Sequence, residues 1–167
     1  GFIGSTLINQ LTAAGWSVKA LARPASAHLL PEIPGLEPVI GSLQDRASLE
    51  RLLQDAYAVV HCAGAVRGAT AADFEAVNVE GVKQLAGAAL SQPSRPRFLS
   101  LSSLAARAPG VSQYASTKRP GEQVLARMAE DIEWVALRPP PGDGPGDKEQ
   151  LTQFKWMGRG KAPEQGE

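Results

Sequence analysis

The sequence predicts an α/β fold in which a parallel β-sheet is covered by helices on both faces. Short apolar runs of strand length alternate with segments whose apolar residues recur at helical spacing, and this alternation is typical of sheets built from βαβ units. The run at residues 57–61 is apolar on both faces, as expected for a buried strand of a parallel sheet. At 167 residues, the chain has the length of one domain.

The first third of the chain predicts two helices and two short strands. Residues 4–14 have apolar side chains at helical spacing, and Gly15 follows as a stop signal. Residues 18–22 form an apolar run of strand length, and residues 38–41 are a second strand candidate. Asp45 is then placed to cap the N-terminus of the helix that follows it.

The remaining elements continue the alternation. Residues 57–61 form the clearest buried strand because they are apolar and contain tandem β-branched residues. Residues 73–90 have a long helical pattern, and residues 98–102 form a strand that ends in hydroxyl side chains. A helix is predicted at residues 112–129 and a last strand at 134–138, where three prolines end the pattern.

Composition and charge exclude several classes of protein and site. Lys and Arg number 17, as do Asp and Glu, so the clustered basic excess of a nucleic-acid binder is absent. No apolar stretch approaches the roughly 20 residues that cross a bilayer. One cysteine, Cys62, and two histidines, His28 and His61, give neither a disulfide nor a zinc motif. We expect no metal, no nucleic-acid or membrane partner, and a cytoplasmic location.

The chain opens with a glycine pattern that is typical of phosphate binding. GFIG (1–4) leads into a helix and matches half of a glycine-rich loop. Glycines allow the backbone to approach a pyrophosphate, and a helix N-terminus adds N–H donors and positive potential. Alone, the pattern is equally typical of a turn before a helix.

A tyrosine and a lysine one helical turn apart form the candidate acid/base pair. Tyr114 and Lys118 project from the same face of the helix predicted at residues 112–129. An ammonium beside a phenol lowers the phenol pKa from about 10, so that the tyrosine can exchange a proton with a substrate oxygen. The upstream strand ends in Ser102 and Ser103, and ligands of such sheets bind outside the carboxyl ends of strands.

Five motifs in chain order give the sequence a specific resemblance. They are GFIG (1–4), HCAG (61–64), NVEG (78–81), LSS (101–103) with YASTK (114–118), and LRPP…GPGD (137–147). With them the chain resembles the extended branch of the short-chain dehydrogenase/reductase superfamily, of the NAD-dependent epimerase/dehydratase type. The resemblance implies a doubly wound, Rossmann-like sheet.

The resemblance also implies roles for individual residues. Tyr114 would be the catalytic acid/base, and Lys118 would lower its pKa and hold the nicotinamide ribose. Ser103, in preference to Ser102, would orient the substrate, and Asn78 would support the site and a bound water. The implied cofactor-binding residues are Gly1, Phe2, Ile3 and Gly4 at the pyrophosphate, Ala63 and Gly64 on the adenosine side, Tyr114 and Lys118, and Pro139 and Pro140 at the nicotinamide end.

The sequence departs from the family pattern in ways that bear on the cofactor. Members that use NAD typically end the second strand with an acidic residue that binds the ribose 2′-hydroxyl. Here Ala22 and Arg23 stand at that place, and a guanidinium suits a 2′-phosphate better. We therefore predict NADP in preference to NAD. Ser42 replaces a common acidic residue near the adenine, and residues 141–143 replace a hydrophobic residue and a tyrosine.

The predicted activity is hydride transfer between a nicotinamide and a carbinol or carbonyl carbon of a small-molecule substrate. One alternative is a nucleotide-sugar epimerase or dehydratase that retains its NAD. Another is a non-catalytic module that senses NADP. The resemblance also allows a homodimer formed through the helices that carry Asn78 and Tyr114.

The motif positions predict the domain organisation. Residues 1–147 are assigned to the NAD(P)-binding domain, and residues 148–167 to the start of a substrate-binding region. Because GFIG lacks the strand and the leading glycine that precede it in the family, we expect the first strand of the fold to be missing. A chain truncated at both ends would bind cofactor weakly or not at all.

Overall fold

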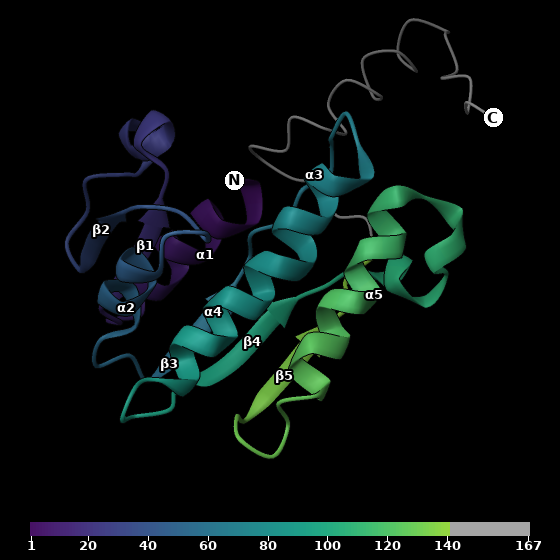
Figure 1. Cartoon of the computed structure of the whole chain (residues 1–167). Coiled ribbons are helices and arrows are strands. Elements are labelled where there is room, and N and C mark those ends of the chain that lie inside the picture. Colours follow the sequence, from purple (N-terminus) through teal and green to yellow (C-terminus); the bar gives the residue numbers. More distant parts are fainter. Residues whose placement is uncertain (141–167) are drawn as a thin grey trace, which may run out of the picture.

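The computed structural model describes residues 1–140, and the residues beyond Pro140 lie outside that range. Their sequence predictions, including the GPGD motif and the region 148–167, are therefore outside the described structure. The elements, in chain order, are α1 (Phe2–Ala13), β1 (Val18–Ala22), β2 (Leu36–Ile40), α2 (Arg46–Leu53), β3 (Ala58–His61), α3 (Ala71–Glu75), α4 (Gly81–Leu90), β4 (Arg97–Leu101), α5 (Gln113–Ala126) and β5 (Trp134–Leu137) (Figure 1).

All strand pairs are parallel, and the predicted α/β class is confirmed. Strand β1 pairs with β2, with Val18 opposite Leu36. Strands β3, β4 and β5 form a second sheet in that order, and their residues pair without a break in register. A parallel pair needs a crossover connection. Helices α3 and α4 lie between β3 and β4, and α5 lies between β4 and β5, whereas the connection from β1 to β2 contains a short 3₁₀ helix at Pro24–Leu29.

The sheet is divided into two parts, where one continuous sheet is typical of the doubly wound fold. Within residues 1–140 no hydrogen-bonded strand pair joins β1 to β3. The complete doubly wound architecture has the strand order 3-2-1-4-5-6, in a numbering of its own that differs from the labels used here. In it the first strand lies between the second and the fourth. Among residues 1–140 no strand precedes α1, and no strand lies between β1 and β3 in the sheet to join the two parts.

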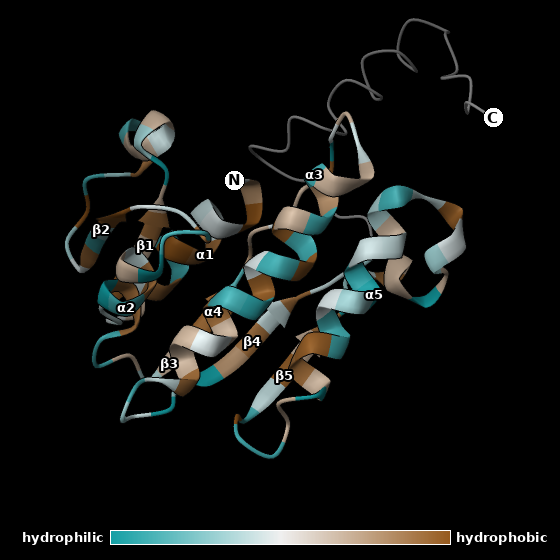
Figure 2. Cartoon of the chain, viewed as in Figure 1, coloured by the Kyte–Doolittle hydropathy of each residue, from teal (hydrophilic) through white to brown (hydrophobic). Residues whose placement is uncertain are grey.

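The hydrophobic core lies between the three-stranded sheet and the helices α2, α4 and α5. Its buried members are Leu49, Leu53, Val59, Val82, Leu85, Ala86, Ala88, Ala89, Phe98, Val124, Leu125 and Ile132. Helices α4 and α5 lie side by side along this sheet (Figure 1), and both combine hydrophilic and hydrophobic residues (Figure 2). No helix among the described residues is long and apolar enough to cross a membrane.

The sequence predicted a single helix over residues 73–90, and the structure divides it. A π-helical turn at Ala76–Glu80 separates α3 from α4. The side chain of Asn78, in this turn, bonds to the backbone of Ala65 and to the hydroxyl of Thr117. Periodicity does not reveal a one-residue insertion of this kind, because the apolar pattern continues through it.

The backbone of the π-helical turn also lies close to the backbone of α5. A Cβ atom at Gly121, in α5, would lie 2.2 Å from the carbonyl oxygen of Asn78. Since carbon and oxygen cannot approach so closely, only glycine allows α5 to pack here at this distance.

We expect Gly121→Ala to destabilise the fold by about 1–3 kcal/mol, because the added methyl group forces α5 away from Asn78. Gly87→Ala is the matched control: Gly87 lies in α4, and its Cβ would meet only an Arg46 side chain at 3.9 Å. The control should be neutral or stabilising, by up to about 1 kcal/mol. Urea denaturation measures both. Equal free energies of unfolding for the two variants would contradict the packing argument.

Candidate active site

The predicted catalytic residues meet at the carboxyl ends of β3, β4 and β5. Gly64 follows β3, Ser103 follows β4 and Pro139 follows β5. Helix α5 brings Tyr114 and Lys118 to the same edge, because the Lys118 amine reaches the last residue of β4. Parallel strands end at one edge of a sheet, so the fold itself gathers these segments.

Helix α5 begins so that the tyrosine is in its first turn. The Ser112 hydroxyl oxygen accepts a hydrogen bond from the Ala115 amide at 3.1 Å and caps the helix. Tyr114 is half-buried, and Nζ of Lys118 lies 5.5 Å from the centre of its ring. The side chains of the predicted acid/base pair are therefore neighbours in space.

The Lys118 amine is buried among polar groups. Its side chain is 9% exposed, and Nζ donates to the carbonyl oxygen of Leu101 at 3.3 Å. Burial lowers the pKa of Lys118, and the charges of Glu122 and Cys62 oppose that effect without cancelling it. A Cβ atom at Gly64 would come within 3.0 Å of Nζ, so the glycine leaves the approach to the amine open.

Asn78 acts as a connector. Its Oδ1 atom accepts from the Ala65 amide at 2.9 Å, and Nδ2 donates to the Ala65 carbonyl at 3.1 Å and to the Thr117 hydroxyl at 3.0 Å. The loop after β3 is thereby fixed to the residue before Lys118. All polar atoms of this buried amide are engaged within the protein, so Asn78 supports the site rather than contacting a substrate.

The two serines after β4 differ in environment. Ser103 is half-buried, and its Oγ atom accepts from the Ala105 amide at 3.2 Å, which leaves the hydroxyl hydrogen unused by that bond. Ser102 is buried, and it lines a cavity of about 10 Å³ together with Lys118 and Glu122. Ser103 remains the predicted substrate-orienting residue because it is the more accessible of the two.

The GFIG segment differs from its predicted form. The helix was expected to begin at Gly4, after a loop, but α1 begins at Phe2 and Gly1 is its N-cap. Phe2, Ile3 and Gly4 thus form the first helical turn, whose amides have no intrahelical acceptor. A Cβ atom at Gly4 would lie 3.9 Å from the Cβ of Cys62, so this helix end adjoins the end of β3.

The other predicted cofactor residues are spread over the same edge. Ala63 and Gly64 are exposed, Pro139 is half-buried and Pro140 is exposed. The carbonyl of Pro139 accepts from the Leu104 amide at 2.9 Å, which joins the chain after β5 to the chain after β4. Arg23 is exposed at the end of β1 and so belongs to the other sheet.

Sequence reasoning missed two residues of the site. Glu122 is buried in α5, and Arg138, just after β5, donates to both of its carboxylate oxygens. A signal was present: Glu122 follows Tyr114 and Lys118 at the same four-residue interval, and this spacing places all three on one helix face.

His61 is packed, as its position at a strand end predicted. It is 4% exposed, and its ring lies 6.3 Å from that of Phe98. Burial, with a smaller contribution from the charge of Lys118, lowers the pKa of His61 to about 4. The imidazole is therefore neutral at physiological pH.

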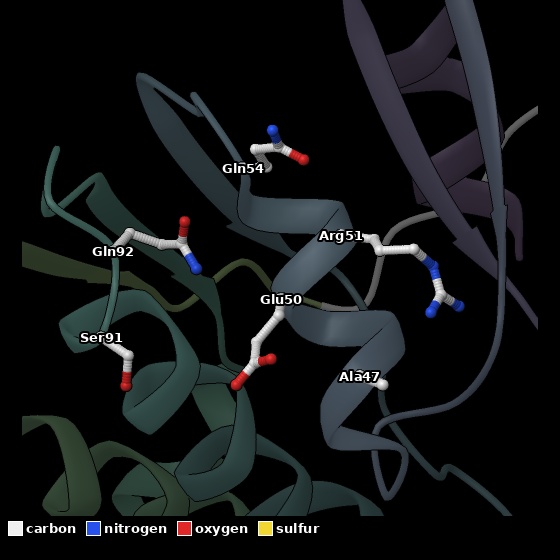
Figure 3. A pocket seen from close by; sticks show the side chains of 6 residues that line it. All are labelled: Ala47, Glu50, Arg51, Gln54, Ser91 and Gln92. Atoms are coloured by element: carbon white, nitrogen blue, oxygen red, sulfur yellow. The ribbon is translucent and has the colours of Figure 1, made fainter.

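Another hollow in the described part of the chain lies away from these residues. It has a volume of about 460 Å³ and is bordered by α2 and the end of α4, near the amino ends of the strands. Figure 3 shows Glu50 turned toward Ser91 and Gln92, and Arg51 turned away from them. Its lining is polar and open, and it contains none of the predicted site residues. Among residues 1–140 no cluster of three metal-ligating side chains occurs.

The sequence matches the profile of the NAD dependent epimerase/dehydratase family over residues 1–157. The chain belongs to this family. Its fold is accordingly that of a family of NAD-binding, oxidoreductase-type enzymes, as the resemblance predicted.

Known relatives agree with this assignment. The chain is 36% identical over 159 residues to a ceramide reductase of Caulobacter vibrioides, covering 95% of this chain and 49% of that protein. It is 32% identical over 90 residues to a 4-hydroxy-2-methyl-3-oxo-4-farnesyl-3,4-dihydroquinoline-1-oxide ketoreductase of Stigmatella aurantiaca, covering 53% of this chain and 27% of that protein. The chain thus spans about half the length of the ceramide reductase.

Solved structural neighbours include enzymes determined with a bound cofactor. The enzyme WbmG of Bordetella bronchiseptica, determined in complex with NAD, superposes with a TM-score of 0.76 at 25% identity. The match covers 96% of this chain and 57% of that one. NAD is thus the cofactor seen in a structural neighbour.

The lowered pKa of His61 makes stability depend on pH. Between pH 6.5 and about 4 the unfolded chain binds a proton at His61 that the folded protein does not, so acid favours unfolding. We expect the free energy of unfolding to fall by up to about 3 kcal/mol across this window.

His61→Leu should remove this part of the pH dependence, and His28→Gln, at an exposed histidine, should keep it. Urea denaturation at pH 7.5 and pH 4.5 gives the comparison. The argument is wrong if His61→Leu retains the full difference between the two pH values.

Proposed function

We propose that the chain is the cofactor-binding and catalytic part of an NADP-dependent reductase or dehydrogenase of the short-chain type. Its substrate would be a small molecule with a carbonyl or carbinol group. The observation that carries the proposal is the buried Lys118 amine beside the ring of Tyr114, at the strand edge where the cofactor of this fold binds.

The residues present fit a dinucleotide. The first turn of α1 offers free amides to a pyrophosphate. Gly64, where a side chain would collide with Lys118, keeps the backbone accessible, and Pro139 and Pro140 border the same edge. When bound, a nicotinamide supplies or accepts the hydride.

The chain's own residues then handle the proton. In the reducing direction the Tyr114 hydroxyl donates its proton to the substrate oxygen as the carbon gains the hydride, and in oxidation it takes the proton back. The ammonium of Lys118 stabilises the phenolate that remains. Ser103 orients the oxygen with its hydroxyl, and Asn78 holds the loop after β3 against α5.

Two sequence relatives favour a reductase over an epimerase or dehydratase. They are named as a ceramide reductase and a ketoreductase of a farnesyl-bearing compound. Both names denote reduction of a molecule with a long apolar part. We therefore propose a carbonyl group on a lipid-like molecule as the substrate class.

We expect Tyr114→Phe to lower turnover of a ketone substrate by about 10²–10⁴-fold, because the proton donor is lost while the ring remains. Cofactor binding should be little changed. Tyr57→Phe is the control, since Tyr57 is exposed and its hydroxyl bonds Arg97 near the start of β4. The measurement is steady-state NADPH oxidation by the natural protein, with all sequence that flanks these residues. Full activity in Tyr114→Phe would refute the proposed role.

The cofactor preference is tested at Arg23. If its guanidinium binds the 2′-phosphate, Arg23→Ala should weaken NADPH binding by about tenfold or more and leave NADH binding unchanged. Arg127→Ala, at an exposed arginine after α5, should alter neither. Fluorescence titration with both cofactors gives the dissociation constants. Tighter binding of NADH than of NADPH by the unchanged protein would overturn the NADP preference.

A further inference from the structure

The side chain of Glu122 lies where three elements of the catalytic side of the site meet. It lies in α5, and its side chain is 9% exposed. From the end of β5, Arg138 donates Nε to Oε1 at 2.8 Å and Nη2 to Oε2 at 2.5 Å. At the end of β4, the buried Ser102 lines a small cavity together with Glu122 and Lys118.

Each of these contacts lies next to a residue of the proposed site. Ser103 follows Ser102, and Pro139 follows Arg138. Lys118 precedes the carboxylate by one helical turn. A shift of this carboxylate would therefore move the substrate side, the acid/base pair and the nicotinamide side relative to one another.

The environment of Glu122 differs from that of an ordinary surface ion pair. Burial raises the pKa of Glu122, but the bonds from Arg138 and the charges of Arg138 and Arg119 hold it below its usual range. In contrast, Glu133 pairs with Arg97 at 2.9 Å with both side chains more than half exposed. Exposed pairs contribute little, whereas the two parallel bonds between Arg138 and the buried Glu122 carboxylate add geometric specificity.

The charge of Glu122 also acts on the amine. The titratable groups that face Lys118 are Tyr114 and Glu122 on its own helix and His61 and Cys62 at the end of β3. The charge of Glu122 raises the pKa of Lys118 against the effect of burial. Neutral His61 adds no compensating charge.

We propose that Glu122 is a positioning residue of the reaction: through its two bonds with Arg138 and its place beside Ser102 and Lys118, it holds Lys118, Ser103 and Pro139 in one arrangement. This inference rests on the proposed function, but its first readout does not require turnover.

The test compares Glu122→Gln, Glu122→Asp and the control Glu133→Gln in the natural protein with its flanking sequence. The Lys118 amine is titrated by NMR of [¹³C]lysine, its signal being identified by its loss in Lys118→Met, and NADPH affinity is measured by fluorescence. Glu122→Gln should move the Lys118 midpoint to lower pH and weaken NADPH binding about tenfold or more. Glu122→Asp keeps the charge but shortens the side chain, so it should largely restore the midpoint and not the affinity.

A Lys118 midpoint and an NADPH affinity that both stay unchanged in Glu122→Gln would overturn the proposal, as would equal changes in Glu133→Gln. If Glu122→Gln does not fold, Arg138→Lys takes its place, because Arg138 is 40% exposed. Arg138→Lys keeps the positive charge but loses the planar guanidinium that donates two parallel bonds, so it should weaken NADPH binding about tenfold. Unchanged NADPH affinity in this variant would overturn the proposal. If Glu122→Gln shifts the Lys118 midpoint while Tyr114→Phe keeps full activity, the proposed function is refuted. The effect of Glu122 on the arrangement of these residues would still stand.

Discussion

At Gly121 the helix α5 lies so close to the backbone of Asn78 that no other residue would fit. The rest of the site depends on this contact. It seats α5 against the π-helical turn, which lets the Asn78 amide reach Thr117 and the loop after β3 together. The Lys118 side chain, one residue beyond Thr117, is thereby carried beneath the ring of Tyr114 and against the end of β4.

The burial that follows from this packing has two opposite effects on Lys118. Removal from water disfavours the ammonium, while the carboxylate of Glu122 favours it. Of these two effects burial is the larger, so the pKa of Lys118 lies below its usual range. The core helices thus determine the electrostatics of the site as well as its shape.

Much of this was predictable from sequence because the decisive signals are local. The alternation of apolar runs identified the α/β class, and the four-residue interval placed Tyr114 and Lys118 on one face. The π-helical turn was not predictable, because it depends on contacts that Asn78 makes with residues distant in sequence. The pair of Glu122 and Arg138 was missed for the same reason: sixteen residues separate its members, and only the fold brings them together.

The division of the sheet has a consequence for handling the protein. Within the described residues, β1 and β3 each have one edge with no neighbouring strand, and Val60 of β3 is 39% exposed. Unpaired N–H and C=O groups along such an edge are templates for strands of other molecules. A preparation limited to these residues is therefore prone to edge-to-edge self-association, and its colloidal behaviour will depend on whether a strand occupies that space.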